Sequence, residues 1–195
     1  MPETVRMRLF AAVLPPADAV DELAVAVRRL HALPGHDGLR WTGHSGWHFT
    51  LAFLGEVDDD LLPAVEGRFG RAAARQNPFP LRIHGGGHFG NRALWAGAAG
   101  GLDAMRMLAD RAHAAARRAG VPMEEHRAYK AHLTIARSRT GSDTDLRPYA
   151  DVLADFEGTA WMVGELALVR SNPPTPGVRG AQPRYEVLRR WGLGH

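Results

Sequence analysis

Two short segments of the sequence place a histidine and a threonine two residues apart inside an apolar run. They are His48 and Thr50 in GWHFTLAFLG, and His132 and Thr134 in AHLTIA. Side chains alternate between the two faces of a β-strand, so each histidine shares a face with its threonine, about 7 Å away. A lone histidine in such a strand is most often a packed core residue. The recurrence of the pair favours a shared chemical role.

The paired residues suit displacement at phosphorus. Imidazole titrates near pH 6.5, so one ring can accept a proton while the other donates one. Threonine hydroxyls can donate hydrogen bonds to the non-bridging phosphate oxygens, although strand propensity is a competing explanation for Thr50 and Thr134. The ten histidines lack the spacing of a zinc site. We therefore predict acid–base catalysis by His48 and His132 that needs no metal and no cofactor.

Hydrophobic periodicity predicts the elements that position these pairs. The segment GGGHFGN, which contains His88 and follows His84, is expected to form a turn-rich loop between two strands. A second loop, rich in proline and glycine, is expected at 171–183. Strands are predicted at 5–13, 46–55, 79–83, 93–96, 131–136, 161–169 and 184–188, and helices at 17–33, 58–76, 102–119 and 146–156.

The order of elements indicates an internal duplication. His132 follows His48 by 84 residues, and the same shift moves the helix at 17–33 into the helix at 102–119. Tight strand pairs favour antiparallel sheets, so the expected class is α+β. We predict a single bilobal domain over residues 1–195. Its two pseudo-symmetric lobes would each be a mainly antiparallel sheet packed with helices, with a central cleft between them.

The composition excludes several classes of protein. At 195 residues, with 45% hydrophobic and 23% charged residues, the chain is typical of a soluble globular protein. It has no cysteine, which rules out disulfides and fits a reducing, cytoplasmic setting. No run approaches the roughly 18 apolar residues of a membrane-spanning helix, and the N-terminal segment is a poor signal peptide. Almost all positive charge is arginine, since Lys130 is the only lysine, and this leaves a polyanionic partner open.

The motif segments HFTLAFLGEV and YKAHLTIAR resemble the two H-x-T-x signatures of the 2H phosphoesterase superfamily. Within it, the chain is similar to the bacterial RNA 2′,3′-cyclic phosphodiesterases, historically called 2′-5′ RNA ligases. The similarity extends to RLFAAVLPP, GGGHFGNRALWAG and RYEVLRRW. It implies that a monomeric enzyme opens the 2′,3′-cyclic phosphate of an RNA end or nucleotide and leaves a 2′-phosphomonoester. The same site could run the reverse reaction and join RNA ends through 2′-5′ linkages.

The resemblance also implies a role for each residue of the two motifs. His48 would protonate the departing ribose 3′ oxygen, and His132 would activate the attacking water. Thr50 and Thr134 would hold the phosphate oxygens.

Two basic residues near the second motif match positions of the same family. Arg137 matches an arginine that contacts the phosphate, but strict alternation would put it on the opposite face from His132, so a bulge or strand end must turn it inward. Lys130 matches a common basic residue, with either a substrate-binding or a structural role. The chain departs from the family at Ala128 and Ala131, where proline is frequent.

Three other functions are compatible with parts of the sequence. The first is a non-catalytic nucleotide- or RNA-binding module of the same fold, although both histidines are present. The second is a phosphodiesterase for small nucleotides that carry a cyclic phosphate. The third is a serine esterase using Ser45, which the spacing of GHSG does not support because the nucleophile motif G-x-S-x-G is missing.

Aromatic residues flank both motifs and could stack on a nucleobase, although core packing is the expected role of any one of them. These residues are Trp41, Trp47, Phe53 and Tyr129. The histidines without a partner pattern are expected at the surface: His31, His36, His113, His126 and His195.

Overall fold

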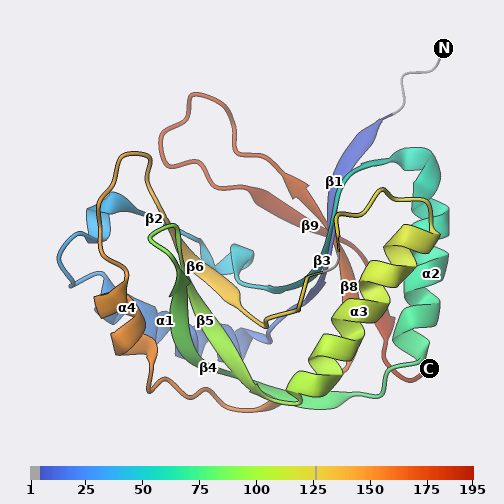
Figure 1. Ribbon diagram of the computed structural model, residues 1–195, viewed down its shortest axis with the longest axis horizontal. Helices are drawn as coiled ribbons and strands as arrows, with labels where there is room; N and C mark the ends of the chain where they lie inside the picture. Colours follow the sequence, from blue (N-terminus) through green and yellow to red (C-terminus); the bar gives the residue numbers. More distant parts are fainter. Residues whose placement is uncertain (1–4, 126) are drawn as a thin grey trace.

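Residues 5–125 and 127–195 are described by a computed structural model with two β-sheets and four α-helices (Figure 1). The sheets have the strand orders β3-β1-β8-β9 and β2-β6-β5-β4-β7, and neighbouring strands run antiparallel, which confirms the α+β prediction. The strands are β1 (Arg6–Val13), β2 (Leu39–Trp41), β3 (Phe49–Asp58), β4 (Phe79–Phe89), β5 (Ala93–Gly100), β6 (Leu133–Ser138), β7 (Trp161–Val163), β8 (Glu165–Asn172) and β9 (Arg184–Gly192). The helices are α1 (Ala17–Leu30), α2 (Leu62–Ala74), α3 (Leu102–Arg118) and α4 (Arg147–Leu153), and single 3-10 turns are η1 (His36–Gly38), η2 (His44–Gly46) and η3 (Asp59–Leu61).

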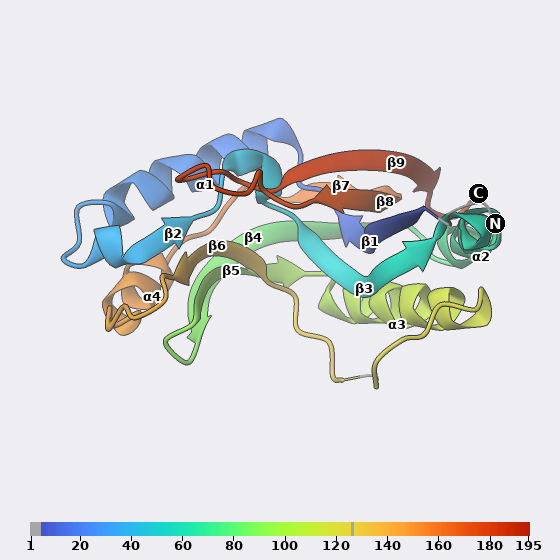
Figure 2. The same ribbon diagram turned by 90° about the horizontal axis from the view of Figure 1, so that it is seen from above.

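The helices are divided between the two sheets. Helices α2 and α3 pack on the four-stranded sheet, and α1 and α4 pack on the five-stranded sheet, at opposite ends of the molecule (Figure 2). Each helix buries one apolar face, as Leu23, Val27 and Leu30 of α1 do at intervals of three and four residues. Within the described part of the chain, no helix is long and apolar enough to cross a membrane.

The two halves of the chain exchange strands between the sheets. Strand β3, from the first half, lies in the sheet that also contains β8 and β9 from the second half. Conversely, β6 pairs with β5, so the second motif strand lies among strands of the first half. Each sheet therefore carries one motif strand, as predicted, but neither sheet is built from one half of the chain alone.

The prediction of a turn-rich loop at GGGHFGN was wrong. Strand β4 continues through the glycines to Phe89, so that His84 and His88 lie on a strand. Packing requires a glycine at position 87, because a Cβ there would overlap the indole of Trp95. The turn is confined to the residues after Phe89, where Gly90 adopts a φ of 53°.

The single strand predicted at 161–169 is in fact two strands in different sheets. Strand β7 pairs with β4, whereas β8 pairs with β1 and β9. The chain changes sheet at Gly164, whose carbonyl accepts a hydrogen bond from the Leu193 amide at 2.8 Å. Hydrophobic periodicity shows which residues of a strand are buried, but it does not show which strand pairs with it. The change of sheet at Gly164 could therefore not be predicted from the sequence.

Candidate functional site

His48 lies immediately before β3, among aromatic rings of the four-stranded sheet. It stacks on Phe10 of β1 with ring centroids 4.6 Å apart, and Tyr185 of β9 approaches edge-on at 5.1 Å. Phe10 also belongs to a small apolar cluster on this face of the sheet, separate from the main core. The ring of His48 is therefore held by packing from β1, which pairs with β3, and from β9 at the other edge of the sheet.

His132 lies immediately before β6 and has a corresponding aromatic frame in the other sheet. The rings of Phe89 and Trp95 approach it edge-on at 5.0 and 6.3 Å. Its Nδ1 lies 2.7 Å from the backbone carbonyl oxygen of Lys130. Because a carbonyl oxygen can only accept, Nδ1 carries the proton and Nε2 of the neutral ring is left to accept one.

A β-bulge turns Phe53 toward the same face as Thr50. Across the pair of β1 and β3, Ala12 lies opposite Thr50 and Phe10 lies opposite Phe53. Within this stretch, Ala11 and Ala12 of β1 are matched by three residues of β3, and Leu51 is the extra residue. Without the bulge, alternation would point Phe53 into the core.

A second bulge at the equivalent position turns Arg137 toward the face of Thr134. Trp95 lies opposite Thr134 and Ala93 lies opposite Arg137, which leaves Ile135 as the extra residue of β6. This is the bulge that the hypothesis for Arg137 required. Arg137 also follows Phe53 by 84 residues, the spacing of the two histidines, so the two side chains occupy equivalent places.

The two motifs share one electrostatic environment. The charge of Arg137 acts on the pKa of His132 and also on that of Tyr185, whose ring contacts His48. Arg137 is therefore near residues of both sheets. Through His132 and through Tyr185, Arg137 thus links the surroundings of the two motif histidines.

Burial lowers the pKa of both histidines. The pKa of His48 falls to about 4, because removal from water disfavours the charged ring. For His132, burial is also the largest cause of the lowered pKa, and the charges of Arg137 and Lys130 lower it further. The hydrogen bond to the Lys130 carbonyl acts in the opposite direction and raises this pKa. Both rings are consequently neutral near pH 7, and a bound anion would favour protonation of either one.

We expect the pKa of His48 to rise when inorganic phosphate binds. An opposite charge within about 4–6 Å raises the pKa of an imidazole by about 1–3 units, so the midpoint should move up from about 4. An NMR titration of the histidine rings, with and without phosphate, measures this shift, and the exposed His195 serves as the control. An unchanged His48 midpoint at saturating phosphate would show that the anion does not bind beside this ring.

The same pKa has a consequence for stability. The pKa of His48 in the folded state lies below the unfolded-state pKa of 6.5. The folding stability that depends on its neutral ring is therefore fully present above about pH 6.5 and is lost as the pH falls toward 4.

The remaining candidate residues have varied surroundings. The Lys130 ammonium lies 4.6 Å from the centroid of the Trp95 ring. Among the flanking aromatics, Trp47 is only 3% exposed and belongs to the core, whereas Phe53 is 70% exposed. Trp41 packs on His31 at 4.2 Å. Of the four aromatic candidates, Phe53 is thus the one that presents an open ring beside a motif.

His31, His36 and His195 are exposed, as predicted, and His113 forms a hydrogen bond with the Glu124 carbonyl. His126 lies outside the described residues. Within residues 5–125 and 127–195, no group of three or more His, Asp or Glu side chains could hold a metal ion.

Four residues that frame the histidines were missed by the sequence analysis. Phe10 and Tyr185 hold His48, and Phe89 and Trp95 hold His132. Their contacts join strands far apart in the sequence, so no local pattern could have identified them. The equivalence of Phe53 and Arg137, in contrast, was available from the 84-residue shift.

Comparison with known proteins places both motifs in a single family model. The model described as LigT like Phosphoesterase matches residues 13–99 and again residues 98–179. The first match contains His48 and the second contains His132.

Relatives and solved structures agree with this match. An RNA 2′,3′-cyclic phosphodiesterase of Thermus thermophilus is 30% identical over 200 residues, covering 96% of this chain and 90% of that protein. A protein of the same name from Geobacillus stearothermophilus is 28% identical over 157 residues; the match covers 78% of this chain but only 47% of the relative. The crystal structure of E. coli LigT complexed with 3′-AMP has a TM-score of 0.75 and 26% identity, covering 98% of this chain and 100% of that chain.

Proposed function

Because this chain belongs to the LigT-like phosphoesterase family, we propose that it hydrolyses the 2′,3′-cyclic phosphate at RNA ends and leaves a 2′-phosphomonoester. The observation that carries the proposal is the pair of framed histidines, of which His132 has Nε2 free as a base. Relatives named RNA 2′,3′-cyclic phosphodiesterase support the reaction class. E. coli LigT complexes with 3′-AMP and ATP support binding of a nucleotide or RNA end.

The reaction follows from the protonation states of the two rings. Water attacks phosphorus while His132 Nε2 takes one of its protons, and the bond from phosphorus to the ribose 3′ oxygen breaks. His48, protonated in the complex because the bound phosphate raises its low pKa, gives its proton to the departing 3′ oxygen. The product keeps its 2′ ester bond. Both proton transfers are made by imidazoles, and the mechanism proposed requires no metal.

Charge on the phosphate oxygens is stabilised by groups from both strands. Thr50 and Thr134 lie on the faces that carry the histidines, and the two bulges bring Phe53 and Arg137 to those faces. A guanidinium donates two parallel hydrogen bonds to a phosphate, and hydroxyls complete the set of donors. We expect these donors to bind the transition state more tightly than the ground state, which is the requirement for catalysis.

Phe53 is the proposed platform for the terminal nucleobase. Its ring is 70% exposed and lies 6.3 Å from the ring of Phe10, on the motif face of β3. Stacking of a base on an aromatic side chain is worth about 1–3 kcal/mol and tolerates any base. The enzyme should therefore accept RNA ends of different sequence.

Several finer expectations remain predictions. We propose a cytoplasmic monomer that consists of one bilobal domain with an internal duplication. The two matched segments of the family model support the duplication. A phosphodiesterase for small cyclic-phosphate nucleotides is the second candidate, because the motif residues act on the phosphate and not on the rest of the RNA.

In the presence of EDTA, the purified protein is expected to convert a short RNA ending in a 2′,3′-cyclic phosphate into the 2′-phosphate product. Chromatography against 2′- and 3′-phosphate standards identifies the product. A 3′-phosphate product would reverse the assignment of the leaving oxygen. Loss of activity in EDTA that zinc restores would contradict the metal-free mechanism, and binding without turnover would favour a non-catalytic module.

A further inference from the structure

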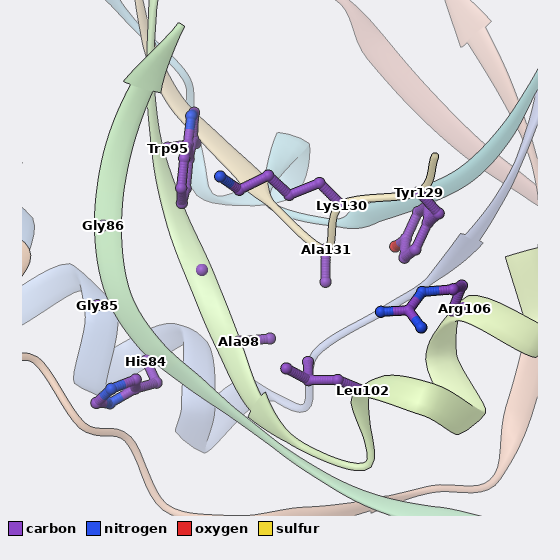
Figure 3. Close-up of a pocket in the computed structure, with 11 residues that line it drawn as sticks. His84, Gly85, Gly86, Trp95, Ala98, Leu102, Arg106, Tyr129, Lys130 and Ala131 are labelled. Carbon is purple, nitrogen blue, oxygen red and sulfur yellow. The ribbon is translucent and has the colours of Figure 1, made fainter. Parts of the chain in front are cut away.

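Figure 3 shows a cavity of about 340 Å³ that is lined in part by Trp95. The ring of Trp95 also lies 6.3 Å from that of His132. Trp95, Tyr129 and Leu102 form apolar walls, and the polar groups come from His84, Arg106 and Lys130. The cavity lies between β4, β5, the start of α3 and the segment that precedes β6. None of its polar groups takes part in the proposed proton transfers.

Two cations and one hydroxyl are available in this cavity. The guanidinium of Arg106 and the hydroxyl of Tyr129 both point toward its interior (Figure 3). Arg106 pairs with Asp103 at 3.2 Å, but both side chains are exposed, so this ion pair holds it only weakly. Among the residues that the structure describes, the buried Tyr129 hydroxyl has no hydrogen-bond partner.

Lys130 connects the cavity with the catalytic base. Its carbonyl oxygen accepts the hydrogen bond from His132 Nδ1, and its ammonium lies over the Trp95 ring that lines the cavity. A ligand that fills the cavity therefore lies directly beside the proposed reaction site. Aromatic walls with two cations suit a nucleotide unit, whose base can stack and whose phosphate can be paired.

We propose that this cavity is a second nucleotide subsite. It holds the RNA unit next to the reacting end, with its backbone phosphate at Arg106 and its base against the apolar walls formed by Trp95, Leu102 and Tyr129. The assignment rests on the proposed function, because only an RNA end supplies a second nucleotide beside the cyclic phosphate. The subsite makes the enzyme prefer an RNA end to a mononucleotide with the same cyclic phosphate.

The first test compares Arg106→Gln with the matched control Arg118→Gln, an exposed arginine at the other end of α3. The substrates are a dinucleotide and a mononucleotide, each with a 2′,3′-cyclic phosphate. For the dinucleotide, Arg106→Gln should lower kcat/KM about tenfold, as expected for the loss of a charged hydrogen bond. It should also reduce the slope of log(kcat/KM) against log[salt] by about 0.7, because one phosphate contact is lost. Mononucleotide hydrolysis and the Arg118→Gln enzyme should be unchanged. Equal losses on both substrates, or no loss on either, would overturn the proposal.

The second test does not depend on turnover. Lys130 is the only lysine, so reductive methylation marks one side-chain amine, which mass spectrometry quantifies. A dinucleotide ending in a 2′-phosphate should slow methylation of Lys130, and a mononucleotide 2′-phosphate should not. Equal rates with and without saturating dinucleotide would overturn the subsite. If the protein hydrolyses neither cyclic substrate, the proposed function fails, and this protection still decides whether the cavity binds a nucleotide.

Discussion

His132→Ala and His48→Ala are each expected to lower kcat by about 10²–10⁴-fold, the usual contribution of a positioned acid or base. Each histidine precedes its strand and contacts aromatic rings at its edge, so removal of the imidazole should leave the strand pairing intact. KM should change much less than kcat, because the phosphate donors and Phe53 remain in place. The measurement is steady-state hydrolysis of a cyclic-phosphate RNA end, with His195→Ala as the control and circular dichroism to verify folding.

The pH dependence distinguishes the two roles. In the native enzyme, kcat/KM should follow a bell whose breaks lie at or below pH 6.5, because the pKa of both rings is lowered. The rising limb requires the base to be neutral, so it should vanish in His132→Ala. The falling limb requires the acid to be protonated, so it should vanish in His48→Ala. If His132→Ala lost the falling limb and His48→Ala lost the rising limb, the acid and base roles would be reversed. Unfolding of both variants would indicate that the histidines are core residues.

Arg137→Ala is expected to lower kcat by about 10²–10³-fold, the cost of removing one donor to the charge of a transition state. The effect should be large because the bulge at Ile135 turns this side chain to the face of Thr134. Arg137→Lys should recover only part of the activity, since an ammonium keeps the charge but loses the planar fork. The matched control is Arg139→Ala, an exposed arginine two residues further along the chain.

A second readout shows whether Arg137 acts beside the catalytic base. Its charge lowers the pKa of His132, so Arg137→Ala should raise that pKa and move the rising limb of kcat/KM to higher pH. An NMR titration of the His132 ring measures the same shift without substrate. A loss of activity without any change in this pKa would indicate that Arg137 lies too far from His132 to contact the same phosphate.

The sequence by itself determined the two motif strands, the helices and the α+β class. These features are encoded locally: alternation puts His48 with Thr50 and His132 with Thr134, and the spacing of apolar residues marks the helix faces. The 84-residue shift also related the two motifs. The described structure agrees with the predicted strand and helix types except at three places: β2 (Leu39–Trp41) was not predicted, β4 extends through its glycines, and β7 and β8 separate.

Only the tertiary structure decided which residues meet. The bulges at Leu51 and Ile135 depend on register with β1 and β5, and each reverses the face of the residues that follow it. Phe10 and Tyr185 reach His48 because β1, β8 and β9 join the first motif strand in one sheet. Exchange of strands between the halves is equally invisible in a local pattern. The hydrophobic period records which side of a strand is buried, whereas pairing partners and register are set by packing between distant parts of the chain.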